Sequence, residues 1–420
     1  MFTIYTRRIH GAAVERNRKL TELFVQAPKR SGSFFRYSCR IESARVGSRV
    51  LWFDVAEEFC DWVTPRADPF LVATLFQLMI EGEPVRVRGD VSASLLEPLH
   101  EYMTLWSSWR PGVCRPISIS ADELLEDHVA ERSDSLLLFS GGMDAQTTLQ
   151  RHIRGEAGNR TRKIGACLYA RGFMNGLEDT ARYRAALENA KASVSAFGDG
   201  QIPLIPIVSN WQELHTRTMP DSIGTGLISF LHLFKSRFGR GMLSSSMSTK
   251  WDMRAYGSHP FSDPLLGHSS FQIECDDTAS TRVDKALYLS DKPEVLDRLL
   301  VCHDFDDEAK NCGACEKCFR TAICFIAHGQ DVPRSIPIDW RACEKKKIHL
   351  KTLRDDPEVC REVFLNTVQQ NLTHPELAKF RRWYQIYLTK EAIKETLLVW
   401  GLRKGLSNDP SAPWAMSGTD

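Results

Sequence analysis

The chain lacks a strong net charge, a long apolar run and an apolar stretch behind its first residues. It carries 54 Lys and Arg against 53 Asp and Glu, a formal net charge of +1, so no overall attraction to nucleic acid or to an anionic membrane is expected. No apolar run approaches the roughly 18–20 residues of a membrane-spanning helix. Arg7 and Arg8 have no apolar stretch behind them, so we expect no secretory signal peptide. These absences predict a cytoplasmic protein without a membrane partner.

The composition bounds the architecture more than the function. A chain of 420 residues is too long for one ordinary core, so two or three domains are expected. Its 43% hydrophobic and 25% charged residues are typical of a globular protein. The 12 cysteines are compatible with a secreted disulfide protein. In a long chain without an export signal, reduced thiols and a metal site are the better interpretation.

Residues 1–130 have the pattern of a separate α+β module. Residues 33–43 and 48–55 resemble two strands joined by a turn, and residues 69–82 have helical periodicity. Between Arg7 and Arg49 stand eleven Lys or Arg and three acidic residues. This basic stretch either binds RNA or a phosphorylated partner, or forms a solvated face of the strands.

From residue 131 to about 330, strand and helix patterns alternate. Apolar segments typical of strands cover residues 135–139, 164–170, 202–208, 241–247 and 271–275, and helical segments lie between or after them. Such alternation predicts an α/β fold with a doubly wound parallel sheet, which binds ligands at the carboxyl ends of its strands. Residues 331–420 contain amphipathic segments at 357–372 and 375–402 and are predicted to form a C-terminal helical extension.

One strand end has the pattern of an anion site. The apolar run 135–139 is followed by Ser140, Gly141, Gly142, Met143 and Asp144, and then by a helical segment. The glycines allow a sharp turn and close backbone approach to a ligand. The first amides and the positive dipole end of the helix would face that ligand. The alternative is a tight strand-to-helix turn with no ligand.

The second pattern is a group of four cysteines, Cys302, Cys312, Cys315 and Cys318. Four thiolates suit a closed tetrahedral zinc site, and Gly313 provides flexibility behind the first cysteine of the trio. An iron–sulfur cluster and a set of core thiols are the alternatives. His303 could replace one thiolate, whereas Cys324 is predicted to be buried on a helix.

Together, the Ser-Gly-Gly-x-Asp turn and the downstream cysteines resemble the PP-loop ATP pyrophosphatases. The resemblance is strongest to the 7-cyano-7-deazaguanine synthase branch, whose members carry a four-cysteine zinc site of similar spacing. It covers roughly residues 134–328, and the cysteines are its more specific part. Relatives with an extra N-terminal domain are associated with anti-phage defence operons.

The resemblance implies roles for particular residues. The turn residues Ser140, Gly141, Gly142, Met143 and Asp144 would hold the ATP phosphates, with Asp144 near Mg²⁺ and pyrophosphate. The backbone of Leu168, Tyr169 and Ala170 would meet the adenine, and Ser245 and Ser246 would close the nucleotide pocket. Lys285 matches a family lysine that faces the phosphates, and Arg282 is a second candidate of this kind. The four cysteines would hold Zn²⁺ in a structural role.

The chain also departs from the family pattern. Ala145 replaces a serine that usually follows the aspartate, so weaker or altered ATP handling is expected. The family's arginine three residues after the last zinc cysteine is matched here only by Arg320, two residues after it. The polar segment 246–267 is predicted to be a substrate-facing loop, with Lys250, Asp252, His259 and Asp263 as candidates.

The resemblance implies an ATP-dependent ligase. A carboxylate, by resemblance that of a 7-deazaguanine acid, would attack the α-phosphate of ATP and release pyrophosphate. Ammonia or a protein amine would then displace AMP, giving an amide or a nitrile. Two alternatives stay open: a tRNA-modifying enzyme of the thiolation type, and a nucleotide-binding scaffold without catalysis, for which Ala145 is the best support.

Overall fold

The computed structural model describes residues 20–126, 134–173, 177–197, 200–215, 219–250, 253–302 and 304–399. The described residues form two compact units. The first contains those up to residue 312 together with 333–337, and the second contains 313–332 and those from 338 onward. The domain boundaries predicted near residues 130 and 330 stay a prediction, because compactness alone does not define domains that fold independently.

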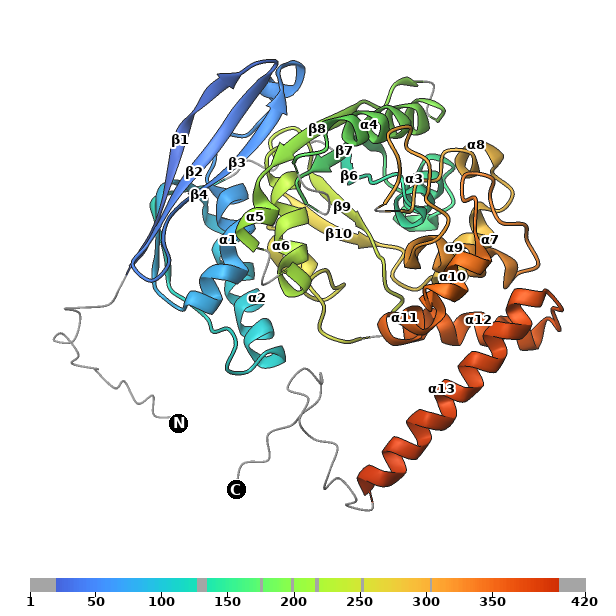
Figure 1. Cartoon of the computed structure of the whole chain (residues 1–420). Helices are drawn as coiled ribbons and strands as arrows, with labels where there is room; N and C mark the ends of the chain where they lie inside the picture. The colour runs from blue at the N-terminus through green and yellow to red at the C-terminus, as the bar shows by residue number, and fades with distance from the viewer. Residues whose placement is uncertain are drawn as a thin grey trace, which may run out of the picture. The chain divides into compact units, whose positions relative to one another are not determined.

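The first unit is built on one ten-stranded sheet (Figure 1). In chain order its strands are β1 (Thr21–Ser31), β2 (Phe34–Ser43), β3 (Gly47–Ala56), β4 (Val85–Ser92), β5 (Ile119–Leu125), β6 (Ser135–Leu138), β7 (Ile164–Arg171), β8 (Leu204–Ser209), β9 (Arg240–Ser244) and β10 (Gln272–Asp276). Their order across the sheet is β10-β9-β6-β7-β8-β3-β2-β1-β4-β5. The helices of this unit are α1 (Asp68–Glu81), α2 (Leu96–Trp109), α3 (Met143–Ile153), α4 (Thr180–Ser195), α5 (Trp211–His215), α6 (Met219–His232), α7 (Arg282–Leu289) and α8 (Pro293–Leu296).

Strands β6 to β10 form the parallel part that positions the candidate site. All neighbouring pairs among them are parallel, and the first strand of the set, β6, lies between β7 and β9. With β6 counted as the first strand, the order is 3-2-1-4-5, which is that of a doubly wound sheet. The α/β class and the mostly parallel sheet predicted from the sequence are therefore confirmed.

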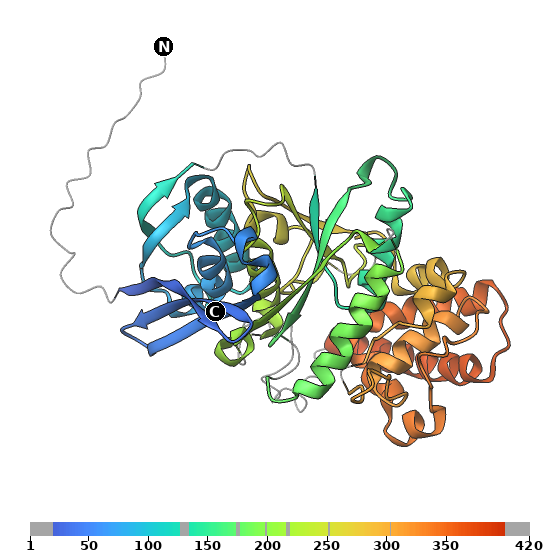
Figure 2. The ribbon, with the colours of Figure 1, turned by 90° about the horizontal axis from the view of Figure 1, so that it is seen from above.

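The apolar strands are covered on both faces, as their sequences predict. Successive side chains of β6 point to opposite faces: Leu136 packs in the core cluster that contains α6, and Leu137 in the cluster that contains α3 and α4. Both side chains are fully buried. Figure 2 shows α4 running along one face of the strands. This double burial explains why β6 reads as a continuous apolar run and not as an alternating strand.

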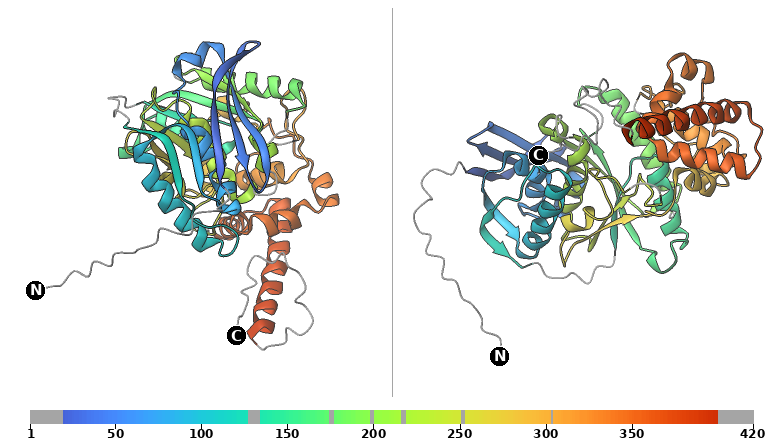
Figure 3. Two further views of the ribbon diagram at one scale, coloured as in Figure 1. Left: turned by 90° about the vertical axis from the view of Figure 1, so that its left-hand side faces the viewer. Right: turned by 90° about the horizontal axis from the view of Figure 1, so that it is seen from below.

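The N-terminal strands continue the same sheet. Strand β3 pairs antiparallel with β8, where Phe53 lies opposite Ser209, and β1, β2 and β3 form an antiparallel meander beyond it (Figure 3). The sheet thus runs across the boundary predicted near residue 130. Four arginines of the basic stretch form ion pairs within this region: Arg30 with Glu57, Arg36 with Asp54, Arg40 with Glu42, and Arg49 with Glu81.

The second unit is helical over its described residues. It contains α9 (Glu316–Ile326), α10 (Trp340–Lys345), α11 (Ile348–Asp355), α12 (Pro357–Gln369) and α13 (Pro375–Val399). The last four confirm the predicted helical character of the C-terminal region. Among the helices that the structure describes, none combines the length and apolar character that a membrane crossing needs.

Candidate active site

The predicted ligand residues lie at the point where the winding of the sheet reverses. Strands β6 and β9 are parallel neighbours, and the chain leaves them at the same edge through Ser140 and Ser245. In doubly wound sheets, ligands bind in the crevice outside the carboxyl ends of two such strands. Leu168 lies on the other side of β6, where its carbonyl accepts a hydrogen bond from the Phe139 amide at 2.9 Å. Tyr169 and Ala170 continue β7 toward the same edge.

The turn between β6 and α3 has the backbone of an anion loop. Gly141 has φ +76°, a left-handed conformation that favours glycine. Gly142 caps α3, and its amide donates to Ser140 Oγ at 3.4 Å. The Leu300 amide donates to the Gly141 carbonyl at 3.2 Å, which holds the turn from behind. Helix α3 has eleven residues, and the first amides of such a helix point toward the turn and favour an anion there.

The side chain of Ala145, on α3, packs into the protein core. It is 4% exposed and belongs to the apolar cluster that contains Leu149 and Phe139. The residue that departs from the family pattern thus contributes to the core.

Two cations converge on Asp144. Lys285 Nζ lies 3.1 Å from Asp144 Oδ1, and Arg282 Nη2 lies 2.9 Å from Oδ2. The Lys285 side chain is only 2% exposed, and its ammonium also donates to the Ser245 carbonyl. The structure therefore brings together residues from three predicted segments: the turn, the end of β9, and α7, which contributes two residues.

Helix α7 presents both cations from its first turn. Thr281 is the N-cap, and a capping box joins it to Asp284: each side chain bonds the other residue's backbone amide. Arg282 and Lys285 are three residues apart and so lie on the same face of the helix. This placement explains why both reach one carboxylate.

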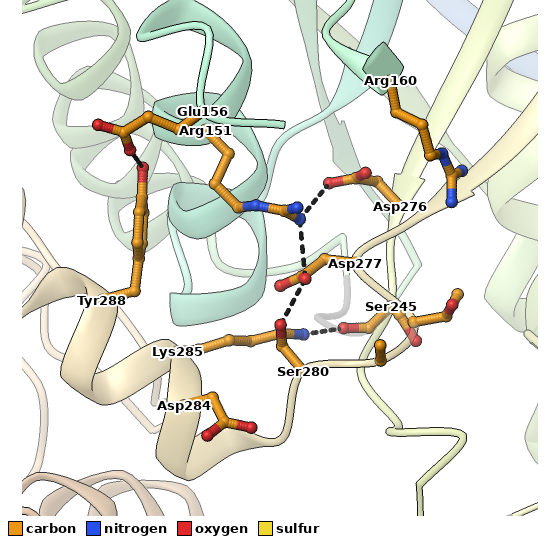
Figure 4. Close-up of polar contacts among 12 residues, drawn as sticks. Arg151, Glu156, Arg160, Ser245, Asp276, Asp277, Ser280, Asp284, Lys285 and Tyr288 are labelled. Atoms are coloured by element: carbon orange, nitrogen blue, oxygen red, sulfur yellow. Dashed lines mark hydrogen bonds and ion pairs between the residues drawn. The ribbon is translucent and has the colours of Figure 1, made fainter. Parts of the chain in front are cut away.

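A second polar group holds the loop between β10 and α7 (Figure 4). Arg151 of α3 bonds Asp277 Oδ1 at 2.8 Å and Asp276 Oδ2 at 3.4 Å, and Ser280 Oγ donates to Asp277 Oδ1 at 2.6 Å. Asp277 has φ +57°, a strained conformation for a residue with a side chain. Sequence reasoning missed Arg151 and Asp277, although two aspartates directly after a strand at the carboxyl edge were a usable signal.

The two neighbouring carboxyls respond differently to this environment. Burial raises the pKa of Asp277, although Lys285, Ser280 and Arg151 oppose the effect. Burial also favours a higher pKa for Asp276, but hydrogen bonding to His152 and the charge of Arg151 outweigh it, so that the pKa of Asp276 is lowered. Lys285 therefore lies in the field of Asp277 as well as of Asp144.

The remaining candidates of this edge fall into two groups. Ser245 is buried, and its hydroxyl donates to the Met247 carbonyl at 2.6 Å, whereas Ser246 and Lys250 are exposed. In the predicted substrate loop, His259 and Asp263 are 1% and 0% exposed. Asp263 accepts hydrogen bonds from the His259 amide at 3.0 Å and from Ser258 Oγ at 2.7 Å, so these two residues hold the loop together. Asp252 lies outside the described residues.

The four predicted cysteines form one group. A sulfur from each of Cys302, Cys312, Cys315 and Cys318 lies within 4.8 Å of the others. Zinc–sulfur bonds of about 2.3 Å in a tetrahedron place the sulfurs about 3.8 Å apart, so this set fits a zinc ion. None of the twelve cysteines, all within the described residues, forms a disulfide.

Local backbone features prepare this cysteine group. Gly313 has φ +68°, as the predicted turn behind Cys312 requires. The Asp304 amide donates to Cys302 Sγ at 3.1 Å, and Cys315 caps α9, its sulfur accepting from the Cys318 amide at 3.5 Å. Amide donors of this kind stabilise thiolates. His303 lies outside the described residues.

Two nearby predictions concern side chains of α9. Cys324 is fully buried, as predicted. Arg320 is 8% exposed and pairs with Glu316 and Asp356.

Comparison with known proteins does not assign the chain to a family. No family model matches the chain, and no curated protein or solved structure is significantly similar to it. We therefore infer the function from the geometry of the site.

Proposed function

We propose that this chain is an ATP-dependent ligase of the PP-loop type that activates a carboxylate by adenylation. One observation carries the proposal: the turn at the start of α3 and the two cations of α7 meet at Asp144, at the carboxyl edge where the sheet reverses. A nucleotide's phosphates find amide donors, a helix dipole and two fixed positive charges there.

The described residues of the site offer positioning and charge, and none of them is an obvious nucleophile. In the proposed reaction, a substrate carboxylate attacks the α-phosphorus of ATP, and the bond to the β-phosphate oxygen breaks. The products are an acyl-adenylate and pyrophosphate. Lys285 and Arg282 stabilise the negative charge that moves onto the leaving pyrophosphate. An attacking amine then displaces AMP and loses a proton, which gives an amide.

The metal ions have separate roles in this proposal. The residues that would hold Mg²⁺ include Asp144, and the ion would supply positive charge to the pyrophosphate. The four cysteines would hold Zn²⁺ as a structural ion, since four thiolates leave no open position for catalysis.

By resemblance, the acid is a 7-carboxy-7-deazaguanine or a close analogue, and the amine is ammonia or an amino group of a protein. A second round of activation on the amide would give a nitrile.

The test is incubation of the full chain with ATP, Mg²⁺ and 7-carboxy-7-deazaguanine, with and without ammonia, followed by mass spectrometry. We expect AMP and pyrophosphate in equal amounts and a product with the mass of an amide or nitrile. Release of ADP and phosphate, or no nucleotide cleavage with any acid and amine tried, would contradict the ligase. Asp144→Asn separates the ligase from a scaffold, because adenylation should be lost while a scaffold would keep its partners.

A further inference from the structure

The carboxylate of Asp144 forms ion pairs with Lys285 and Arg282, the two cations that would bind a phosphate. Both of its oxygens are engaged, Oδ1 by Lys285 at 3.1 Å and Oδ2 by Arg282 at 2.9 Å. All three side chains are less than one-fifth exposed. Ion pairs so shielded from water keep much of their strength.

Lys285 has little freedom to serve another anion at the same time. Its ammonium has three donors: one bonds Asp144, and a second bonds the Ser245 carbonyl. Arg282 reaches Asp144 through Nη2. A free polyphosphate in this site would therefore compete with Asp144 for both cations and would lie beside a like charge.

We propose that Asp144 is an internal counter-ion which makes the site accept metal-complexed polyphosphate and reject the free anion. Once Asp144 binds a divalent cation, Lys285 and Arg282 can exchange their ion pairs with Asp144 for ion pairs with phosphate oxygens, so metal and polyphosphate bind together. This inference depends on the proposed function, because it assumes that the site binds a polyphosphate.

The experiment measures inorganic pyrophosphate binding by isothermal titration calorimetry, in EDTA and in Mg²⁺. The wild-type chain should bind pyrophosphate only in the presence of Mg²⁺. Asp144→Asn removes the competing charge and should bind free pyrophosphate in EDTA at least about tenfold more tightly than the wild type, since like-charge juxtaposition is costly. The same variant should gain little from Mg²⁺.

Two further variants make the result specific. Asp291→Asn removes one negative charge from an exposed residue just beyond the far end of α7, and it should behave as the wild type does in both conditions. Asp144→Ala should repeat the gain of Asp144→Asn. Circular dichroism and thermal unfolding with and without pyrophosphate show that each variant is folded, and a folded Asp144 variant should be stabilised by free pyrophosphate.

The outcomes separate the inference from the function. If the wild type binds free pyrophosphate as tightly as the Asp144 variants do, the counter-ion role is wrong and the polyphosphate site stands. If Asp291→Asn gains as much as Asp144→Asn, the effect is one of net charge and the counter-ion role is again wrong. If no folded variant binds pyrophosphate in either condition, both the inference and the proposed function fail.

Discussion

Asp263 should make the stability of the protein depend on pH. Its carboxyl is fully buried, and burial raises its pKa from 3.8 to about 7, although the His259 amide and the Ser258 hydroxyl oppose the shift. The folded protein therefore holds a proton here that the unfolded chain releases at lower pH. Asp263→Asn should remove this titration and keep the shape of the side chain.

The direction and the size of the change in stability with pH follow from the linkage between proton binding and folding. Between pH 4 and pH 7 the folded state binds more protons at Asp263 than the unfolded state does, so stability falls as the pH rises through this window. A pKa rise from 3.8 to about 7 corresponds to about 4 kcal/mol over the whole window. Between pH 5 and pH 8, the part available to experiment is about 3 kcal/mol.

The assay is urea unfolding of the wild type and Asp263→Asn at several pH values from 5 to 8. The difference in unfolding free energy between the variant and the wild type should shift by about 3 kcal/mol in favour of the variant as the pH rises from 5 to 8. Asp291→Asn is the control, because the pKa of Asp291 is lowered, mainly by its hydrogen bond to Lys292, and so contributes no slope in this range. Parallel pH profiles for the wild type and Asp263→Asn would refute the reasoning.

Three further predictions concern backbone and metal. Asp277→Gly should be more stable in urea than Asp277→Ala by about 1 kcal/mol, because only glycine adopts φ +57° without strain; equal stabilities would contradict this. Gly172→Ala should lower the free energy of unfolding by at least about 2 kcal/mol, since its Cβ would lie 1.7 Å from the Ser209 carbonyl oxygen. The Cβ of the control Gly155→Ala meets open space, so this variant should lose only about 1–2 kcal/mol, for its left-handed φ. Cys318→Ser should lose most of about one equivalent of zinc per chain by elemental analysis, and Cys324→Ala, buried on the same helix, should retain it.

The parallel part of the sheet was predictable because local sequence patterns indicate its strands, turns and helices. The apolar run before Ser140 and the Gly-Gly turn identify a buried strand that feeds a helix. Parallel strands expose their carboxyl ends at one edge, so residues after different strands were expected to meet. Ser140 and Ser245 do follow neighbouring parallel strands at this edge. The position of Lys285 beside Asp144 was expected from the family resemblance alone, because no strand pattern predicts it.

The continuation of the sheet through β3 and β8 was not predictable in the same way. Antiparallel pairing of Phe53 with Ser209 joins residues far apart in sequence, and neither segment signals its partner. The left-handed φ of Asp277, which accompanies its ion pair with Arg151, was not predictable either. A left-handed φ at a non-glycine residue is imposed by tertiary contacts and leaves no mark in the composition.

The loop with His259 and Asp263 shows the limit of reading function from residue type. Both residue types are common in active sites, yet here they are buried and bond within their own loop. Burial and partners, which the sequence does not reveal, decide between a reactive group and a structural one.

The most direct test of the central claim is the exchange of labelled pyrophosphate into ATP in the presence of the substrate acid and Mg²⁺. We expect acid-dependent exchange in the wild type. We also expect a loss of about a hundredfold to a thousandfold in Lys285→Met, because a fixed charge at the leaving pyrophosphate is removed. Equally fast exchange in Lys285→Met would contradict the ligase mechanism. Label that enters ATP only at the γ-phosphate would also contradict it, because exchange of intact pyrophosphate labels both the β- and the γ-phosphate.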